Sequence, residues 1–320
     1  METEVLLPTP ASISQAARLL KQGQLVAFPT ETVYGLGARI FDEAAINRIY
    51  LAKGRPSDNP LIAHIASLSE VDRIAKDVPA SFYYLAQAFF PGPLTMIVPR
   101  NDMVPKNTNP NAATIAIRMP NHEVALALIK AVGEPLVAPS ANLSGKPSPT
   151  SASDVLEDMN GKISAILDGG PCQVGIESTV LDLTQTTPTI LRPGAITKAA
   201  IEKVLKNTVM EPKSSEGQPL LAPGMKYKHY SPDTHIMLSS SWEEIKNFVT
   251  SNPGKKNLLL TNQSPPSDIL FQKQEPLSTV TLYALFRTAD RMGFDEILIF
   301  LDEKTQADSG IMNRIEKAAR

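Results

Sequence analysis

Residues 24–37 have the sequence QLVAFPTETVYGLG, an apolar run followed at once by a polar segment with two glycines. The run Gln24–Phe28 predicts a buried strand, and the helix predicted before it, Ser12–Leu20, ends at Gly23. The segment Pro29–Gly37 then leaves that strand with hydroxyls, a carboxylate and the glycines. Ligands bind at the carboxyl ends of strands in open α/β sheets, so this segment is either a binding loop or a structural turn that caps the next helix.

Helix and strand signals alternate through the first two thirds of the chain, which predicts an α/β fold with a twisted, open, mixed sheet. The predicted strands are Leu61–Ile65, Leu94–Val98, Thr114–Arg118, Leu136–Ala138, Ile163–Leu167, Thr179–Leu183 and Thr189–Leu191. The predicted helices are Glu43–Lys53, Ser81–Phe90, Glu123–Val132, Ala152–Met159 and Thr197–Leu205.

A change in composition after Leu205 indicates a second domain. Residues 207–233 contain four prolines among Ser, Gly, Lys and Glu, which favours a linker. The α/β rhythm then resumes, with strands at His235–Leu238, Asn257–Leu260 and Glu296–Leu301 and helices at Trp242–Val249, Leu282–Met292 and Ile311–Ala319. We therefore expect a first domain over 1–207, a linker over 208–233 and a smaller Rossmann-like α/β domain over 234–320.

The composition excludes several classes of protein. With a net charge of −2, the chain is not a globally basic nucleic-acid binder. No apolar run approaches the roughly 20 residues that span a bilayer, and Met1–Pro10 does not resemble a targeting segment. The single Cys172, in a Gly-Gly-Pro-Cys turn, cannot form an internal disulfide, and the four histidines are scattered. We expect a cytoplasmic protein with no structural metal and no membrane association.

Basic residues lie in a loop and at strand ends of the predicted sheet. Lys53 and Arg55 lie two apart on a stiff loop, and together they suit a polyphosphate, although a solvated loop is the alternative. Arg118 ends an apolar strand, where it needs water, a ligand or a nearby acid. Arg192 also ends a strand. His64 lies inside an apolar strand, which by itself favours a buried, hydrogen-bonded core histidine.

Further polar segments follow other predicted strands. Residues 138–150 offer hydroxyls, an amide and backbone N–H groups, but they lack the glycine spacing of a Walker motif; a Ser/Pro-rich connector is the alternative. Residues 168–170 and 175–180 are two more such segments. Within the linker, Pro223–Pro232 has two tyrosines, a histidine and lysines, which suggests a segment that folds over a ligand. Together these segments predict one pocket at the carboxyl edge of the sheet, acting by positioning and charge neutralisation.

Seven ordered segments resemble the YrdC-like domain of threonylcarbamoyl-AMP synthases: Pro29–Ala38, Lys53–Ile65, Pro91–Val98, Ile115–Pro120, Ala138–Pro149, Gly175–Thr179 and Leu191–Gly194. The segments Pro223–Pro232 and Ile311–Ala319 resemble the two-domain form of that family. The resemblance covers nearly the whole chain. It implies a YrdC-like catalytic domain over 1–207, a linker over 208–233 that covers the active site, and a C-terminal domain of unassigned role. Asp308-Ser309-Gly310 is a reduced version of the glycine-rich segment that usually precedes the last helix.

The resemblance implies that L-threonine, bicarbonate and ATP give threonylcarbamoyl-AMP and pyrophosphate for tRNA threonylcarbamoyladenosine modification. Magnesium is expected to arrive with ATP and to share the neutralisation of its charge. Downstream threonylcarbamoyl-transfer proteins are expected partners, with tRNA met only indirectly. The rival readings are an RNA-binding module, which the acidic balance disfavours, and a carbamoyl-adenylate-forming enzyme, which the linker motif disfavours.

The resemblance also implies residue roles. Lys53 and Arg55 are the expected catalytic cations, facing the triphosphate. The expected threonine-binding residues are Thr32, His64, Arg118, Ala138 (through its backbone) and Ser178. The expected nucleotide-binding residues are Arg55, Asn59, Thr114, Ser140, Ser148, Arg192 and, closing over from the linker, Tyr230.

Overall fold

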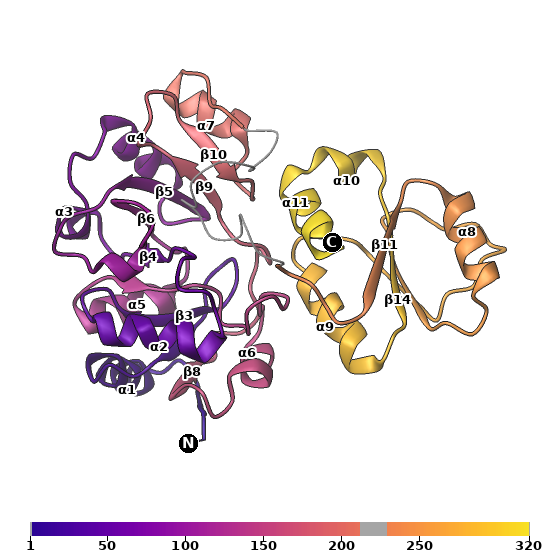
Figure 1. Cartoon of the computed structure of the whole chain (residues 1–320), viewed down its shortest axis with the longest axis horizontal. Helices are drawn as coiled ribbons and strands as arrows, with labels where there is room; N and C mark the ends of the chain where they lie inside the picture. The colour runs from indigo at the N-terminus through magenta and orange to yellow at the C-terminus, as the bar shows by residue number, and fades with distance from the viewer. Residues whose placement is uncertain (1, 212–228, 320) are drawn as a thin grey trace. The chain divides into compact units, whose positions relative to one another are not determined.

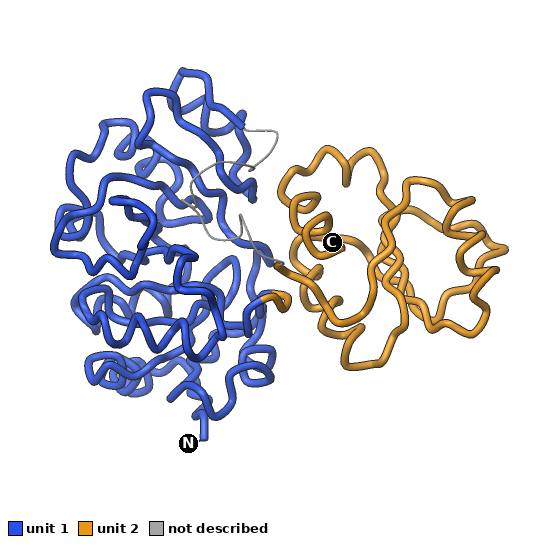
Figure 2. Tube along the Cα trace, viewed as in Figure 1, with its two compact units in different colours: residues 1–144, 148–227 blue, residues 145–147, 228–320 orange. Residues whose placement is uncertain are grey.

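The computed structural model describes residues 2–211 and 229–319, and it divides into two compact units (Figures 1 and 2). Unit 1 comprises residues 1–144 and 148–227, and unit 2 comprises residues 145–147 and 228–320. Most of the linker expected over 208–233 lies outside the described residues. The domain boundaries drawn from the sequence therefore stay a prediction.

Unit 1 is built on a ten-stranded mixed sheet with the order β1-β8-β2-β3-β7-β4-β6-β5-β9-β10 (Figure 1). Its strands are β1 Glu4–Leu6, β2 Val26–Phe28, β3 Gly35–Arg39, β4 Ile62–His64, β5 Leu94–Pro99, β6 Thr114–Arg118, β7 Leu136–Val137, β8 Ala165–Leu167, β9 Thr179–Asp182 and β10 Thr189–Arg192. Its helices are α1 Pro10–Lys21, α2 Glu43–Lys53, α3 Val71–Ile74, α4 Ala80–Phe89, α5 Glu123–Val132, α6 Ala152–Met159 and α7 Lys198–Leu205, with 3₁₀ turns η1 Leu68–Glu70 and η2 Lys106–Thr108. The mixed α/β sheet expected from the sequence is confirmed.

Helix α2 shows why its bounds match those expected from the sequence. The Asp42 side chain accepts a hydrogen bond from the Ala45 backbone N–H, which satisfies one of the free donors at the helix start. Gly54 ends the helix in the left-handed conformation, at φ +59°, which glycine adopts without steric cost.

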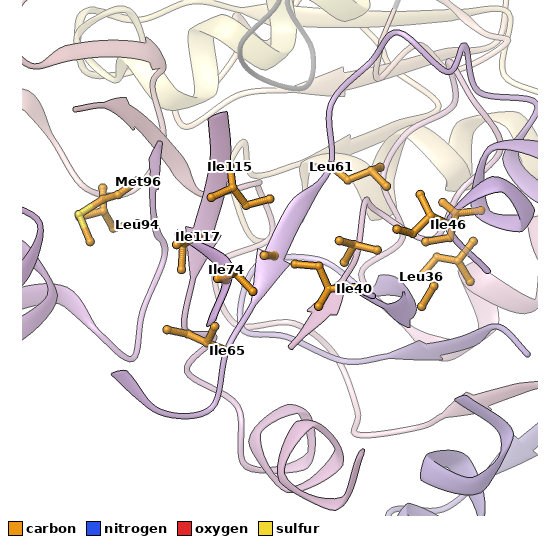
Figure 3. Packing of buried hydrophobic residues seen from close by; sticks show 14 of the residues in the cluster. Leu36, Ile40, Ile46, Leu61, Ile65, Ile74, Leu94, Met96, Ile115 and Ile117 are labelled. Atoms are coloured by element: carbon orange, nitrogen blue, oxygen red, sulfur yellow. The ribbon is translucent and has the colours of Figure 1, made fainter. Parts of the chain in front are cut away.

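The strands at the centre of the sheet have two unlike faces, because side chains alternate along a strand. Ile115 and Ile117 of β6 point into the main hydrophobic core, together with Ile46 of α2 and Ile74 of α3 (Figure 3). Side chains of α4 belong to the same core. On the opposite face, Ala116 belongs to a small apolar cluster with Ile62, Ile97 and Val180. Residues 114 and 118 flank Ala116 on that face, because side chains two apart along a strand point the same way.

The segment Pro29–Gly37, the first motif, contains the start of strand β3, whereas its sequence predicts a loop throughout. Leu36 pairs with Ala27, and Gly35 pairs with Phe28, so β3 returns antiparallel to β2. A side chain at Gly37 would come within 2.9 Å of the Phe28 ring. The two glycines therefore make room for that ring, and the loop part of the motif is confined to residues 29–34.

Unit 2 contains a parallel four-stranded sheet with the order β11-β14-β12-β13, as expected for a second Rossmann-like domain. Its strands are β11 His235–Ser239, β12 Asn257–Leu260, β13 Lys273–Glu275 and β14 Glu296–Phe300, and its helices are α8 Trp242–Ser251, α9 Leu282–Met292, α10 Glu303–Ala307 and α11 Ser309–Ala318. Helix α8 lies on one side of the sheet and α9 and α11 on the other (Figure 1). In the described parts of both units, every helix is too short or too polar to cross a bilayer.

Candidate functional site

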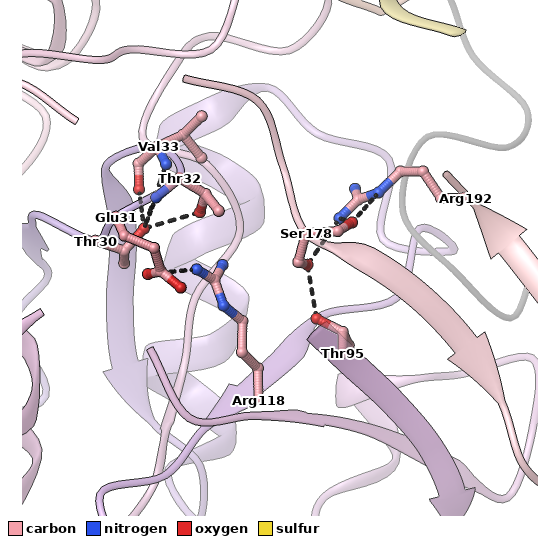
Figure 4. Close-up of polar contacts among 8 residues, drawn as sticks. All are labelled: Thr30, Glu31, Thr32, Val33, Thr95, Arg118, Ser178 and Arg192. Carbon is pink, nitrogen blue, oxygen red and sulfur yellow. Dashed lines mark hydrogen bonds and ion pairs between the residues drawn. The ribbon is translucent and has the colours of Figure 1, made fainter. Parts of the chain in front are cut away.

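A buried ion pair forms the centre of the candidate site. Arg118 at the end of β6 contacts Glu31 in the loop after β2, with 2.7 Å between Arg118 Nη2 and Glu31 Oε2 (Figure 4). Both side chains are almost fully buried, at 5% and 4% exposure. Within the described residues, Glu31 Oε1 and Arg118 Nε have no hydrogen-bond partner. Desolvated charges need further partners, so this pair is suited to a ligand that carries charges of its own.

Glu31 is the residue that sequence reasoning missed. The sequence shows Glu31 only as the carboxylate of the first motif. For Arg118 it predicts contact with water, a ligand or a nearby acid. The structure shows that pairing. The available signal was that Glu31 is the sole acid in a motif that follows a buried strand.

The loop around Glu31 is held by its own hydroxyls. Thr30 Oγ1 donates to the Val33 carbonyl at 2.6 Å, so the Thr32 hydroxyl is the donor in the 2.9 Å contact between the two threonines (Figure 4). Thr30 Oγ1 also accepts from the backbone N–H groups of Thr32 and Val33. These bonds fix Thr32, which is fully buried, next to Glu31.

His64 lies beside Arg118, because the two residues are paired in register between β4 and β6. Its Nδ1 lies 3.2 Å from the Ile62 carbonyl, which can only accept, so Nδ1 carries the proton and Nε2 is left as an acceptor. Burial, and then the Arg118 charge, lower the pKa of His64 to about 3. The imidazole is therefore neutral near pH 7, which fits both a core histidine and a neutral ligand contact.

Arg192 and Ser178 form a second group. Arg192 Nε and Nη2 donate to the Ser178 carbonyl at 3.1 and 3.0 Å, and the Ser178 hydroxyl lies 2.7 Å from that of Thr95 (Figure 4). A side chain at Gly194 would come within 2.6 Å of the Thr179 backbone nitrogen, so this close approach requires glycine. Thus one predicted nucleotide residue and one predicted threonine residue are in direct contact.

A third group consists of Lys53, at the end of α2, and the loop after β7. Its ammonium donates to the carbonyl oxygens of Ser140 and Asn142, both at 2.5 Å. Ser140 in turn forms an isolated antiparallel bridge with Gly35, within the first motif. In this structure Lys53 fastens the loop that carries Ser140, and its contact with a triphosphate stays a prediction.

Arg55 donates hydrogen bonds to carbonyl oxygens of its own loop. Its Nη2 donates to the Pro60 carbonyl at 3.1 Å and its Nε to the Asn59 carbonyl at 3.4 Å. The Ser148 hydroxyl donates to Glu177, the residue before Ser178, at 2.5 Å. This bond links the segment 138–150 to the second group.

The expectation of a single carboxyl edge was wrong, because the sheet is mixed. Strands β2 and β7 run opposite to β4, β6 and β10. One edge contains the ends of β2 and β7, which are followed by Thr32, Ala138 and Ser140. The same edge contains the starts of β4 and β6, near Asn59 and Thr114. His64, Arg118 and Arg192 end strands at the opposite edge. The Arg118–Glu31 contact connects the two edges, so the site extends over a face of the sheet.

Tyr230 belongs to unit 2, where it is buried and has a left-handed backbone at φ +65°. Its ring stacks on Tyr283, with 5.6 Å between centroids, and the Arg314 guanidinium lies 5.5 Å from its centroid. Residues 223–228 of the linker motif lie outside the described residues. The closing of Tyr230 over a nucleotide stays a prediction.

The described residues contain no group of three or more His, Cys, Asp or Glu side chains that could hold a metal ion. The two buried carboxylates of the site are bound, Glu31 by Arg118 and Glu177 by Ser148. These residues do not fit a resident magnesium site.

The fold and the site define an α/β protein with buried, paired charged groups over one face of a mixed sheet. Two family models match the chain: one described as "Telomere recombination" over residues 18–194, and one described as "Threonylcarbamoyl-AMP synthase, C-terminal domain" over residues 196–320. The chain belongs to the Sua5/YrdC family of threonylcarbamoyl-AMP synthases, in its two-domain form.

Relatives of full length support this assignment. The threonylcarbamoyl-AMP synthase of Pyrococcus abyssi is 42% identical, over 95% of this chain and 93% of its own length. The synthase of Bacillus subtilis is also 42% identical, over 99% of this chain and 95% of its own length. The crystal structure of P. abyssi Sua5 complexed with L-threonine matches with a TM-score of 0.91 at 40% identity, covering 100% of this chain and 98% of that one.

Proposed function

We propose that this chain converts L-threonine, bicarbonate and ATP into threonylcarbamoyl-AMP and pyrophosphate, for the threonylcarbamoyladenosine modification of tRNA. The observation that carries the proposal is the buried Arg118–Glu31 pair with its unpartnered polar atoms. It occurs in a chain whose relative from P. abyssi was crystallised with L-threonine.

The ion pair complements an amino-acid zwitterion. The free Nε edge of Arg118 suits the threonine carboxylate, because a guanidinium binds a carboxylate through two parallel N–H groups. Glu31 Oε1 suits the ammonium group. The remaining proposed threonine contacts are Thr32, the neutral His64, the Ala138 backbone and Ser178.

The proposed reaction has two bond-forming steps. The threonine nitrogen must lose a proton before its lone pair bonds to the bicarbonate carbon, which gives a carbamate and releases water. A carbamate oxygen then bonds to the α-phosphorus of ATP, and the bond to pyrophosphate breaks. ATP carries about four negative charges, so preset cations stabilise the developing charge. Arg55 and Arg192 are the proposed cations, with Asn59, Thr114, Ser140, Ser148 and Tyr230 as further nucleotide contacts.

Lys53 acts in this proposal by holding the Ser140 loop as well as by its charge. Any magnesium would arrive with ATP as part of the substrate, and it would add positive charge to that of the cations named above. Downstream threonylcarbamoyl-transfer proteins are the proposed consumers of the product, since an acyl-adenylate is an activated donor.

The test is to incubate the purified chain with labelled bicarbonate and to omit L-threonine, ATP or bicarbonate in turn. The proposal predicts that labelled threonylcarbamoyl-AMP and pyrophosphate form only when all three are present. Product formation from carbamoyl phosphate in place of bicarbonate and threonine would instead support a carbamoyl-adenylate-forming enzyme. Salt-sensitive RNA binding without any adenylate would support the RNA-binding alternative.

A further inference from the structure

The connection between β5 and β6 contains a buried arginine that the proposed function does not use. Arg100 is 9% exposed, and its guanidinium hydrogen-bonds to oxygen atoms of its own connection. Its Nη1 donates at 3.3–3.4 Å to the carbonyl oxygens of Pro105, Lys106 and Asn109 and to the Thr108 hydroxyl. One guanidinium therefore holds the turn that includes η2 in a fixed shape.

This turn packs on the loop proposed to face the triphosphate. The Tyr50 hydroxyl donates to the Asn107 carbonyl at 2.8 Å, and the Leu61 backbone N–H donates to the Thr108 carbonyl at 2.9 Å. Asn111 Nδ2 donates to the Asp58 carbonyl at 2.5 Å. Residues 107–111 are thus hydrogen-bonded to helix α2 through Tyr50 and to the connection between α2 and β4 through Asp58 and Leu61.

Asn109, at the end of the turn, has an unused polar group. Its side chain is 3% exposed, and its Nδ2 donates to the Thr114 hydroxyl at 2.9 Å. Its Oδ1 is buried and has no hydrogen-bond partner among residues 2–211 and 229–319. A buried amide oxygen without a donor is costly, and its presence beside Thr114 points to a ligand that supplies one.

We propose that Asn109 recognises the nucleoside part of ATP and that Arg100 is the residue that positions it. An amide oxygen only accepts, so it selects a hydroxyl or an amine over phosphate oxygens, which also only accept. The adenine amine and the ribose hydroxyls are the two sources of such a donor. The inference rests on the proposed function, because it requires the ATP site beside Thr114.

The test is calorimetric titration of Asn109→Ala with ATP and, separately, with L-threonine. The expected result is about fivefold weaker ATP binding, the worth of one neutral hydrogen bond, with unchanged threonine binding. ITP, 2′-deoxyATP and 3′-deoxyATP identify the donor: the analogue that lacks it binds wild type and variant equally. Asn101→Ala is the matched control, because both ends of that amide are already bonded, to Asp72 and Met103. The control should bind ATP as wild type does.

Unchanged ATP affinity in Asn109→Ala overturns the proposal, as does an equal loss for threonine or for all the nucleotides. Arg100→Lys tests the positioning role, with the same selective loss for ATP expected. If Arg100→Lys weakens threonine binding equally, the role of Arg100 is only structural. A wild-type chain that binds threonine but no nucleotide would refute the proposed function itself.

Discussion

Replacement of Glu31 by Gln removes one charge from the buried pair and leaves Arg118 without its counter-ion. Breaking a buried pair on one side costs about 3–5 kcal/mol, because an uncompensated charge remains in a desolvated place. Both side chains here are at least 95% buried, so the upper part of that range applies. At roughly 2–4 °C per kcal/mol for a unit of about this size, a loss of about 4–5 kcal/mol should lower the melting temperature of unit 1 by about 8–20 °C.

Thermal unfolding followed by circular dichroism measures this change, and Glu134→Gln is the matched control. Glu134 pairs with Arg39 at 2.9 Å, but the Arg39 side chain is 30% exposed. A pair of this kind contributes about 0–1 kcal/mol. Equal melting temperatures for Glu31→Gln and Glu134→Gln would refute the reasoning. Titration with L-threonine adds a second measure: the loss of a charged partner for the ammonium should weaken binding by about 10- to 100-fold.

Three further predictions concern other parts of the site. Because His64 has a native pKa of about 3 and an ordinary unfolded value near 6.5, the unfolded state alone takes up its proton between those pH values, so stability falls as pH falls through this window. Urea unfolding at pH 7 and pH 5 should therefore show a smaller loss of stability for His64→Asn than for wild type; equal losses would contradict the low pKa. Lys53→Met releases the carbonyl oxygens of Ser140 and Asn142 and should weaken ATP binding by at least tenfold in a direct titration, whereas unchanged affinity would remove Lys53 from the site. Burial raises the pKa of Cys172 to about 12, so iodoacetamide at pH 8 should label it only after denaturation, and rapid labelling of the folded chain would count against this account.

The periodic elements were predictable because local signals decide them. Strand β6, Thr114–Arg118, was expected with its observed bounds because a continuous apolar run, Ile115–Ile117, ends at the arginine. Strand β3 was not expected, because its glycine-rich sequence indicates a turn, and its pairing with β2 depends on the packing of Phe28. Very short strands such as β1 and β13 have too few residues to show a period.

The candidate site was only partly predictable for a related reason. Motif order identified Arg118 and the first motif, but strand direction is not visible in a sequence. The expected single edge therefore became two edges of a mixed sheet. The contact between Glu31 and Arg118 joins residues 87 positions apart, and only the folded chain reveals it. Asn109 lies outside every recognised motif, and it became a candidate only through its buried, unbonded oxygen.

The central claim is that the Glu31–Arg118 pair receives the amino-acid group of L-threonine. A crystal structure of this chain with L-threonine tests it most directly. The account predicts the threonine carboxylate within hydrogen-bond distance of the Arg118 guanidinium and the amino group within that distance of Glu31. Threonine bound elsewhere, with the ion pair untouched, would contradict it.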